Sequence, residues 1–207
     1  MANPAIPRQD VHNLAEGCAS DAENFQFVAN RLLRDQKAVT RFLSENFDAI
    51  GPQNGQIATY MAAVSLRIFE MLGGRMRKIP RRQIDRAAVA VHGVVDSVLP
   101  ADDGVPGRVR AIEWRAQPHL LDEILWALFE KQHDEEEEIE IEPQVATMIF
   151  LTLWPLVESM DATWKPAKGY DGTPITDEPF DPDAPQGDSD PDLEPTEPMV
   201  RAQPAAD

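Results

Sequence analysis

The chain has 207 residues and a formal net charge of −17, which results from 36 acidic and 19 basic side chains. Its apolar content of 43% is too high for a wholly disordered chain and too low for a membrane protein. The single cysteine, Cys18, excludes an intrachain disulfide framework and any metal site built from several cysteines. A charge this negative repels nucleic-acid phosphates, so we expect no general nucleic-acid binding unless the charge is segregated.

The sequence carries no recognisable signal for export or for membrane insertion. Residues 1–8 lack an apolar stretch of signal-peptide length. The most apolar stretch, residues 145–157, is shorter than the roughly 20 residues that a membrane span needs. Together with the free cysteine, these features favour a reducing compartment, and we expect a cytoplasmic protein without membrane contact.

The composition changes sharply near residue 164. Residues 164–207 contain 9 of the 18 prolines and 11 acidic residues, against only three cations. Their isolated apolar residues cannot bury enough surface to offset the entropy of ordering the chain. The sequence therefore predicts a flexible arm over 1–19, a helical domain over 20–164 and a disordered acidic tail over 165–207.

The first two expected helices occupy residues 20–50 and 54–72. The first begins at a capping box, Ser20 to Glu23, and its apolar residues recur at steps of three and four. Because an α-helix rises 1.5 Å per residue, this helix would be roughly 45 Å long, which suits a bundle. Glycine-containing pairs end both helices.

Three further helices are expected in the second half of the chain. The third follows Pro80 and ends before Pro100, and the loop over 101–117 has room for one short helical piece. The fourth begins with Pro118, since proline is favoured in a first turn. The fifth, residues 143–162, is apolar on most sides, so we expect it to be central. The pattern predicts an all-α fold, an antiparallel bundle of about five helices.

One pair of residues has the spacing of a metal-binding motif. Glu130 and His133 match the Glu-x-x-His pair that one helix contributes to a di-iron carboxylate bundle. Such a centre needs a second pair and two further glutamates, and the sequence does not supply them at a recognisable spacing. We therefore predict two exposed polar residues with neither metal nor cofactor, and a metal-dependent bundle remains an alternative.

The remaining reactive side chains form no catalytic motif. The other histidines share no ligand spacing, and Cys18 lies in the expected flexible arm, where no base is held beside it. Nucleophile-elbow, phosphate-loop and zinc-protease signatures are also missing from the sequence. We therefore expect a protein that is not an enzyme.

Two charge runs are the most distinctive features of the sequence. A basic run lies between the second and third expected helices: Arg75, Arg77, Lys78, Arg81 and Arg82. An acidic run follows the fourth: Glu135, Glu136, Glu137, Glu138 and Glu140. Both place charges of the unfavourable sign beside a helix end. Three interpretations stay open: the runs compensate each other, they bind external partners, or they are solvated at a cost of a few tenths of a kcal/mol each.

An up-down order of helices makes the first interpretation specific. Short connections favour antiparallel neighbours, and this order places both runs at one end of the bundle. There each run would offset the other's mismatch with its helix dipole.

The sequence favours a non-enzymatic protein–protein interaction module, such as an adaptor, a scaffold component or an inhibitor-type partner. Its means of contact would be the charged patches and the acidic tail. A polyanion mimic or toxin-neutralising partner of a basic protein is a second alternative. We expect a protein partner, with basic proteins as one candidate class, while the oligomeric state stays open.

Overall fold

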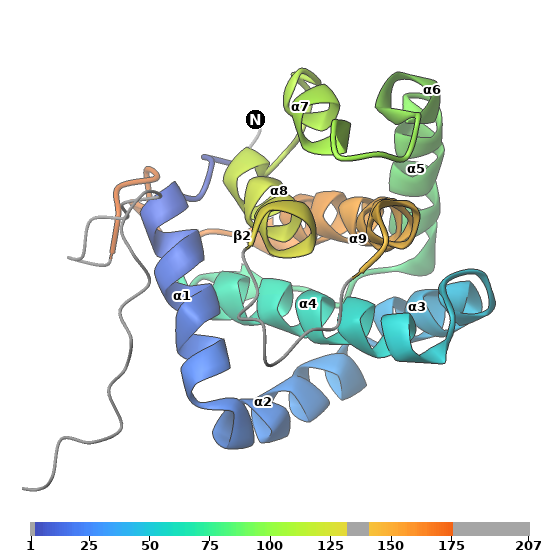
Figure 1. Cartoon of the computed structure of the whole chain (residues 1–207). Coiled ribbons are helices and arrows are strands. Elements are labelled where there is room, and N and C mark those ends of the chain that lie inside the picture. The colour runs from blue at the N-terminus through green and yellow to red at the C-terminus, as the bar shows by residue number, and fades with distance from the viewer. Residues whose placement is uncertain (1–2, 132–140, 176–207) are drawn as a thin grey trace, which may run out of the picture.

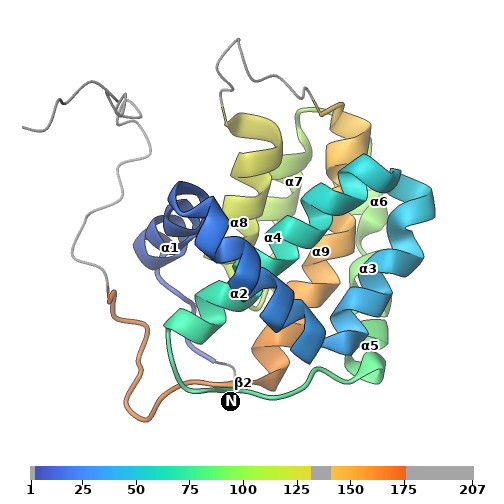
Figure 2. The same ribbon diagram turned by 90° about the horizontal axis from the view of Figure 1, so that it is seen from below.

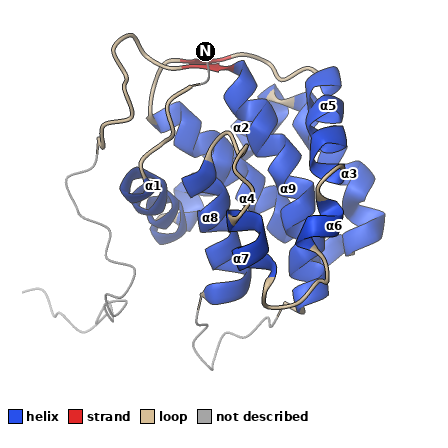
Figure 3. Ribbon diagram, turned by 90° about the horizontal axis from the view of Figure 1, so that it is seen from above, coloured by secondary structure: helices blue, strands red, loops and turns tan. Residues whose placement is uncertain are grey.

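The structure, a computed structural model, describes residues 3–131 and 141–175 and is all-α, as the sequence predicts (Figure 1). Within these residues the only paired strands are β1 (Arg75–Met76) and β2 (Trp164–Lys165), which run antiparallel (Figure 3). The α-helices of this part of the chain are α1 (Arg8–Ser20), α2 (Ala22–Asp35), α3 (Lys37–Ile50), α4 (Pro52–Met71), α5 (Arg81–His92), α6 (Val95–Val98), α7 (Val105–Arg110), α8 (Pro118–Leu125) and α9 (Pro143–Thr163).

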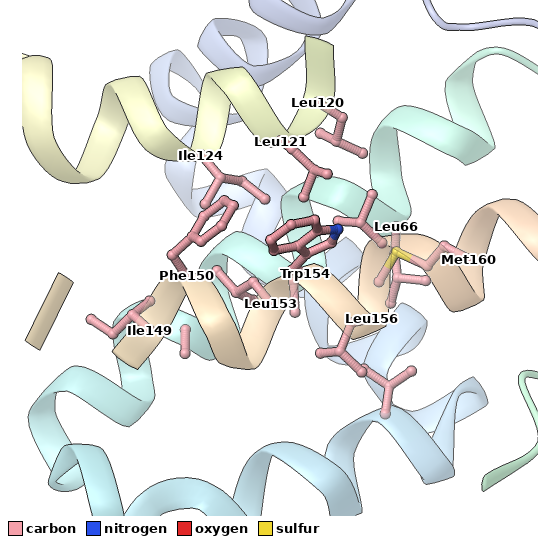
Figure 4. Packing of buried hydrophobic residues seen from close by; sticks show 14 of the residues in the cluster. Leu66, Leu120, Leu121, Ile124, Ile149, Phe150, Leu153, Trp154, Leu156 and Met160 are labelled. Carbon is pink, nitrogen blue, oxygen red and sulfur yellow. The ribbon is translucent and has the colours of Figure 1, made fainter. Parts of the chain in front are cut away.

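The core is built around α9, which confirms its expected central place. Helices α3, α4, α5 and α8 all pack against it (Figure 1). Trp154 of α9 is fully buried, and its indole lies among side chains of α4, α8 and α9, including Leu66, Leu121 and Phe150 (Figure 4). By length and composition α9 could cross a membrane, yet 72% of its most apolar window is buried, which is the pattern of a core helix.

The N-terminal region corrects the expectation of a flexible arm over 1–19. Residues 8–20 form α1, which packs against α4 and α8 and buries Val11 completely. The preceding residues are held by hydrogen bonds: the Ile6 N–H donates to Gln117 Oε1 at 2.8 Å, and Asn3 Nδ2 donates to the Asp161 carbonyl at 2.8 Å. This segment is therefore part of the folded domain.

The single long helix expected over 20–50 is wrong, because the chain bends at Asp21 and Gln36. Asp21 separates α1 from α2 and forms no side-chain cap hydrogen bond, so the expected capping box is not formed. Gln36 separates α2 from α3 with φ −106° and ψ 58°. Two shorter helices, α2 and α3, therefore replace the expected single helix, and α2 crosses over α4 (Figure 2).

The other expected helices are present with adjusted ends. The second corresponds to α4, and the third is divided into α5 and α6. The fourth begins at Pro118 as α8 and ends in a π-helical turn, η1 (Trp126–Glu130), where the Lys131 N–H donates to the Trp126 carbonyl at 2.7 Å. The short piece expected around residues 108–115 corresponds to α7, which lies earlier, at Val105–Arg110.

The first residues of the expected tail belong to the folded domain. After β2, the ring of Tyr170 packs edge-on against Trp164, with the ring centroids 5.6 Å apart. The Ile175 N–H then donates to both carboxylate oxygens of Asp10, at 2.9 and 3.0 Å. The domain boundary therefore moves from residue 165 to residue 175, and the rest of the expected tail lies outside the described residues.

Candidate functional site

The basic run lies at the C-terminal end of α9. Arg75 is paired with Lys165 across the two strands, and the Arg77 N–H donates to the Thr163 carbonyl at 3.4 Å. Gly74 permits this close approach, because its φ is +79° and a Cβ atom there would collide with the Lys165 carbonyl oxygen. The backbone of the run is thereby fixed while its five basic side chains stay exposed.

Gln36 connects the basic run to the junction of α2 and α3. Its side-chain Nε2 donates to the Arg77 carbonyl at 3.1 Å, and its Oε1 accepts from the Ile79 N–H at 2.9 Å. Both Gln36 and Ile79 are buried. Two cations of α3, Lys37 and Arg41, are therefore brought to the same surface as the run.

An ion-pair cluster joins α3 to the start of α5. Arg81 donates to Glu45 at 2.6 Å and to Asp85 at 2.7 Å, and Arg41 donates to Glu45 at 2.9 Å. The hydrogen bonds from Arg41 and Arg81 lower the pKa of Glu45, and those to Asp85 and Glu45 raise the pKa of Arg81. The charge of Arg81, unfavourable at a helix N-terminus, is thus compensated by acids of α3 and α5.

We call this surface the basic end. It comprises eight exposed cations: Lys37, Arg41, Arg75, Arg77, Lys78, Arg81, Arg82 and Lys165. Apart from Arg41 and Arg81, these side chains form no ion pair with any residue in 3–131 or 141–175. Elsewhere the arginines are commonly paired, as are Arg31, Arg67, Arg108, Arg110 and Arg115. Six described cations without an ion pair therefore lie at the basic end, while Arg34, Arg86, Lys131 and Lys168 are unpaired elsewhere among the described residues.

Two helices begin at this surface, and two others end there. Helix α3 starts at Lys37 and α5 at Arg81, and neither has an acidic residue in its first turn or a side-chain cap. The unpaired amides of a helix N-terminus carry about half a positive charge. Helices α2 and α9 end at the same surface with the opposite partial charge, so the positive potential of the basic end comes from its cations.

The net charge of the chain is strongly segregated. Residues 176–207 contain ten acids and one arginine, and residues 132–140 contain six acids. The described residues retain 20 acids and 18 cations, a net charge of −2. The folded part is therefore nearly neutral, and it displays a basic surface that the overall charge of −17 conceals.

The residues that flank the acidic run do not lie at the same end of α9 as the basic run. The acidic run itself lies outside the described residues, but the elements that flank it, η1 and α9, place its attachment points at the N-terminal end of α9. The basic run lies beyond Thr163, at the other end of a 21-residue helix that is about 30 Å long (Figure 2). The expected up-down order is therefore wrong, because the residues that flank the acidic run lie at one end of α9 and the basic end lies at the other.

The candidate metal pair is not supported by its surroundings. Both carboxylate oxygens of Glu130 accept from Arg110, at 2.7 and 3.1 Å, and this pairing raises the pKa of Arg110. His133 lies outside the described residues. Among the residues that the structure places, no group of three His, Cys, Asp or Glu side chains is arranged to hold a metal ion.

Apart from the basic end, the described structure has a cavity between α1, α4 and α8. It is a largely apolar cavity of about 120 Å³, lined by residues that include Met61, Ile68, Leu120 and Trp126. Beside it, His12 Nδ1 lies 3.0 Å from Glu123 Oε1, and the His12 ring packs edge-on against Trp126. The sequence could not indicate this feature, because His12 was assigned to a flexible arm. The cavity could accommodate a small apolar group.

No protein-family model, no curated protein and no solved structure matches this chain. The functional interpretation therefore depends on the residues themselves. The structure brings the five predicted basic residues together and adds three that the sequence did not indicate: Lys37, Arg41 and Lys165. Lys37 and Arg41 are four residues apart and share a helix face, but which helix meets the basic run is decided by tertiary structure.

Proposed function

We propose that this protein is a non-enzymatic interaction module of the cytoplasm that binds an acidic segment of a partner protein at its basic end. The observation that carries the proposal is the group of cations without an ion pair in the described structure: Lys37, Arg75, Arg77, Lys78, Arg82 and Lys165. Like charges held together repel each other, and an anionic partner relieves that repulsion.

An acidic protein segment suits this surface better than nucleic acid. The six acids in 132–140 and the net charge of −9 in 176–207 repel a long polyanion such as DNA or RNA. A short acidic peptide presents fewer charges, and its carboxylates suit the guanidinium groups of Arg75, Arg77 and Arg82, which have no ion pair in the described structure. The fixed backbone of the basic end also reduces the entropy lost on binding.

The proposal is tested by capture from a native lysate with the full-length protein and two variants of equal net charge. R77Q/R82Q removes two charges from the basic end. Q53E/Q56E adds two acids at exposed positions in the first turns of α4, at the far end of that helix from β1. Exposed charge contacts contribute about 0.2–1 kcal/mol each, so R77Q/R82Q should weaken the complex roughly 2- to 30-fold.

We expect Q53E/Q56E to retain the partner and R77Q/R82Q to retain less of it. Capture should also decline as salt is raised, because the contacts are exposed. Equal capture by both variants would contradict the proposal, since the two differ only in where the charge is changed. A basic protein captured equally by both would instead favour the polyanion-mimic alternative.

A further inference from the structure

The C-terminal acidic segment follows the basic end closely along the chain. Residues 166–175 continue directly from β2, whose Lys165 is part of that surface, and run to Ile175 beside α1 (Figure 2). Asp10 holds the Ile175 amide there. Residues 176–207 therefore start only about ten positions after a cation of the basic end.

The charges of this segment complement those of the basic end. Residues 176–207 have a net charge of −9. The basic end has eight cations, and only two acids, Glu45 and Asp85, are paired within it. A surface with this excess of positive charge attracts the nearest dense group of carboxylates.

The segment is also long enough to reach all parts of the basic end. Its 32 residues span up to about 100 Å when extended, roughly three times the length of α9. A tethered segment binds intramolecularly, at an effective concentration in the millimolar range for a short connection. An acidic segment of another molecule lacks this advantage.

We propose that residues 176–207 bind the basic end of their own chain and compete with an acidic partner for it. The proposal uses the same surface as the proposed function and adds its regulation. The chain then controls access to its own binding surface. A partner must displace the segment, so its apparent affinity falls by the fraction of molecules in which the basic end is occupied.

The acidic run over 132–140 cannot reach the basic end in place of residues 176–207. Its neighbours Lys131 and Ile141 are both fixed near the N-terminal end of α9, about 30 Å from the basic end. Nine residues attached at both ends extend at most about 18 Å from their attachment points, half of their full length. The C-terminal segment is attached at one end only within the described structure, and it has the required length.

The first test measures contact within the full-length protein, without any partner. A spin label is attached at S189C, and its effect on the backbone amides of Arg77 and Lys78 is recorded by NMR. Cys18 does not compete for the label, because its side chain is buried and burial raises the pKa of its thiol. We expect these amides to be broadened, and the broadening to diminish in about 0.5 M salt, where charges are screened within about 4 Å.

Variants identify the contact. R77Q/R82Q should reduce the broadening at residues 77–82, while Q53E/Q56E, with the same net charge, should leave it intact. Mixing spin-labelled chains with isotope-labelled chains shows whether the bound segment belongs to the same chain or to a second copy. Broadening in the mixed sample as strong as in the chain that carries both labels assigns the contact to a second copy and overturns the proposal. Broadening that is absent, or that is equal at the start of α4, also overturns it.

The second test uses a glutamate homopeptide of about twelve residues as the probe. Neutralising the segment with D188N/D190N/D192N/E194Q should tighten probe binding about tenfold, because the competitor is weakened. Equal affinity for the wild type and this variant overturns the proposal and leaves the proposed function intact. Broadening in the wild type, with no partner captured even by D188N/D190N/D192N/E194Q, would retain the contact and refute the proposed function.

Discussion

Replacement of Gln36 by alanine tests whether one buried amide holds the basic end together. Gln36 lies between α2 and α3, and its side chain bonds the Arg77 carbonyl and the Ile79 N–H. The substitution removes both hydrogen bonds but no charge. A change in stability or in acidic-peptide binding would therefore report the geometry of the surface and not its net charge.

The expected cost follows from the two broken bonds. The Ile79 N–H is buried and would lose its partner, which costs about 1–3 kcal/mol. The Arg77 carbonyl is only partly buried, so its lost bond adds about 0.5–1.5 kcal/mol. We expect Q36A to lower the free energy of unfolding by about 1.5–4.5 kcal/mol and to weaken acidic-peptide binding, since Lys37 and Arg41 lose their fixed position beside the run.

Urea unfolding followed by circular dichroism measures this cost. Q26A is the matched control, because Gln26 is exposed on α2 and its replacement should change stability by no more than about 0.5 kcal/mol. If Q36A unfolds at the same urea concentration as Q26A, the Gln36 amide does not hold the junction of α2 and α3 to the basic run. The role of Gln36 in shaping the basic end would then be refuted.

Two further predictions concern the surroundings of α9. Burial raises the pKa of Glu158 above its ordinary 4.5, so stability from this group is greatest below pH 4.5 and falls as pH rises. E158Q retains an oxygen acceptor for Trp154 Nε1, and its unfolding free energy should fall less between about pH 4.5 and 7 than that of the wild type; an equal or larger fall would contradict this. G74A should lower the free energy of unfolding, measured by thermal or urea unfolding, by about 1–3 kcal/mol or more. G17A should not lower it, because a Cβ atom at this position of α1 meets open space.

Hydrophobic periodicity was sufficient to predict α4, α5, α8 and α9, because each of them presents a clear apolar stripe. It failed at α1, where Val11, Leu14 and Cys18 have helical spacing but form a short stripe. The surface that buries Val11 includes α8, about 100 residues further along the chain. Local pattern cannot report a partner at that separation.

The bend at Gln36 shows a second limit of sequence interpretation. No glycine or proline marks it, so residues 22–50 have the pattern of one continuous helix. The bend is held by hydrogen bonds to residues 77 and 79, which lie 41 and 43 positions away. The same tertiary bonds bring Lys37 and Arg41 to the basic run. The place of five of the eight cations in one surface was therefore predictable from their closeness in the sequence, and the place of the other three was not.

The hydrogen bond between Asp10 and the Ile175 amide has a mechanical consequence. A force that pulls on the chain beyond Ile175 acts first on this bond, and only afterwards on the contact between Tyr170 and Trp164. The two-residue pairing of β1 with β2 is the last element on this path. Tension on the C-terminal segment therefore reaches α1 first, and it reaches β2 and the basic end only after the Asp10 and Tyr170 contacts have broken.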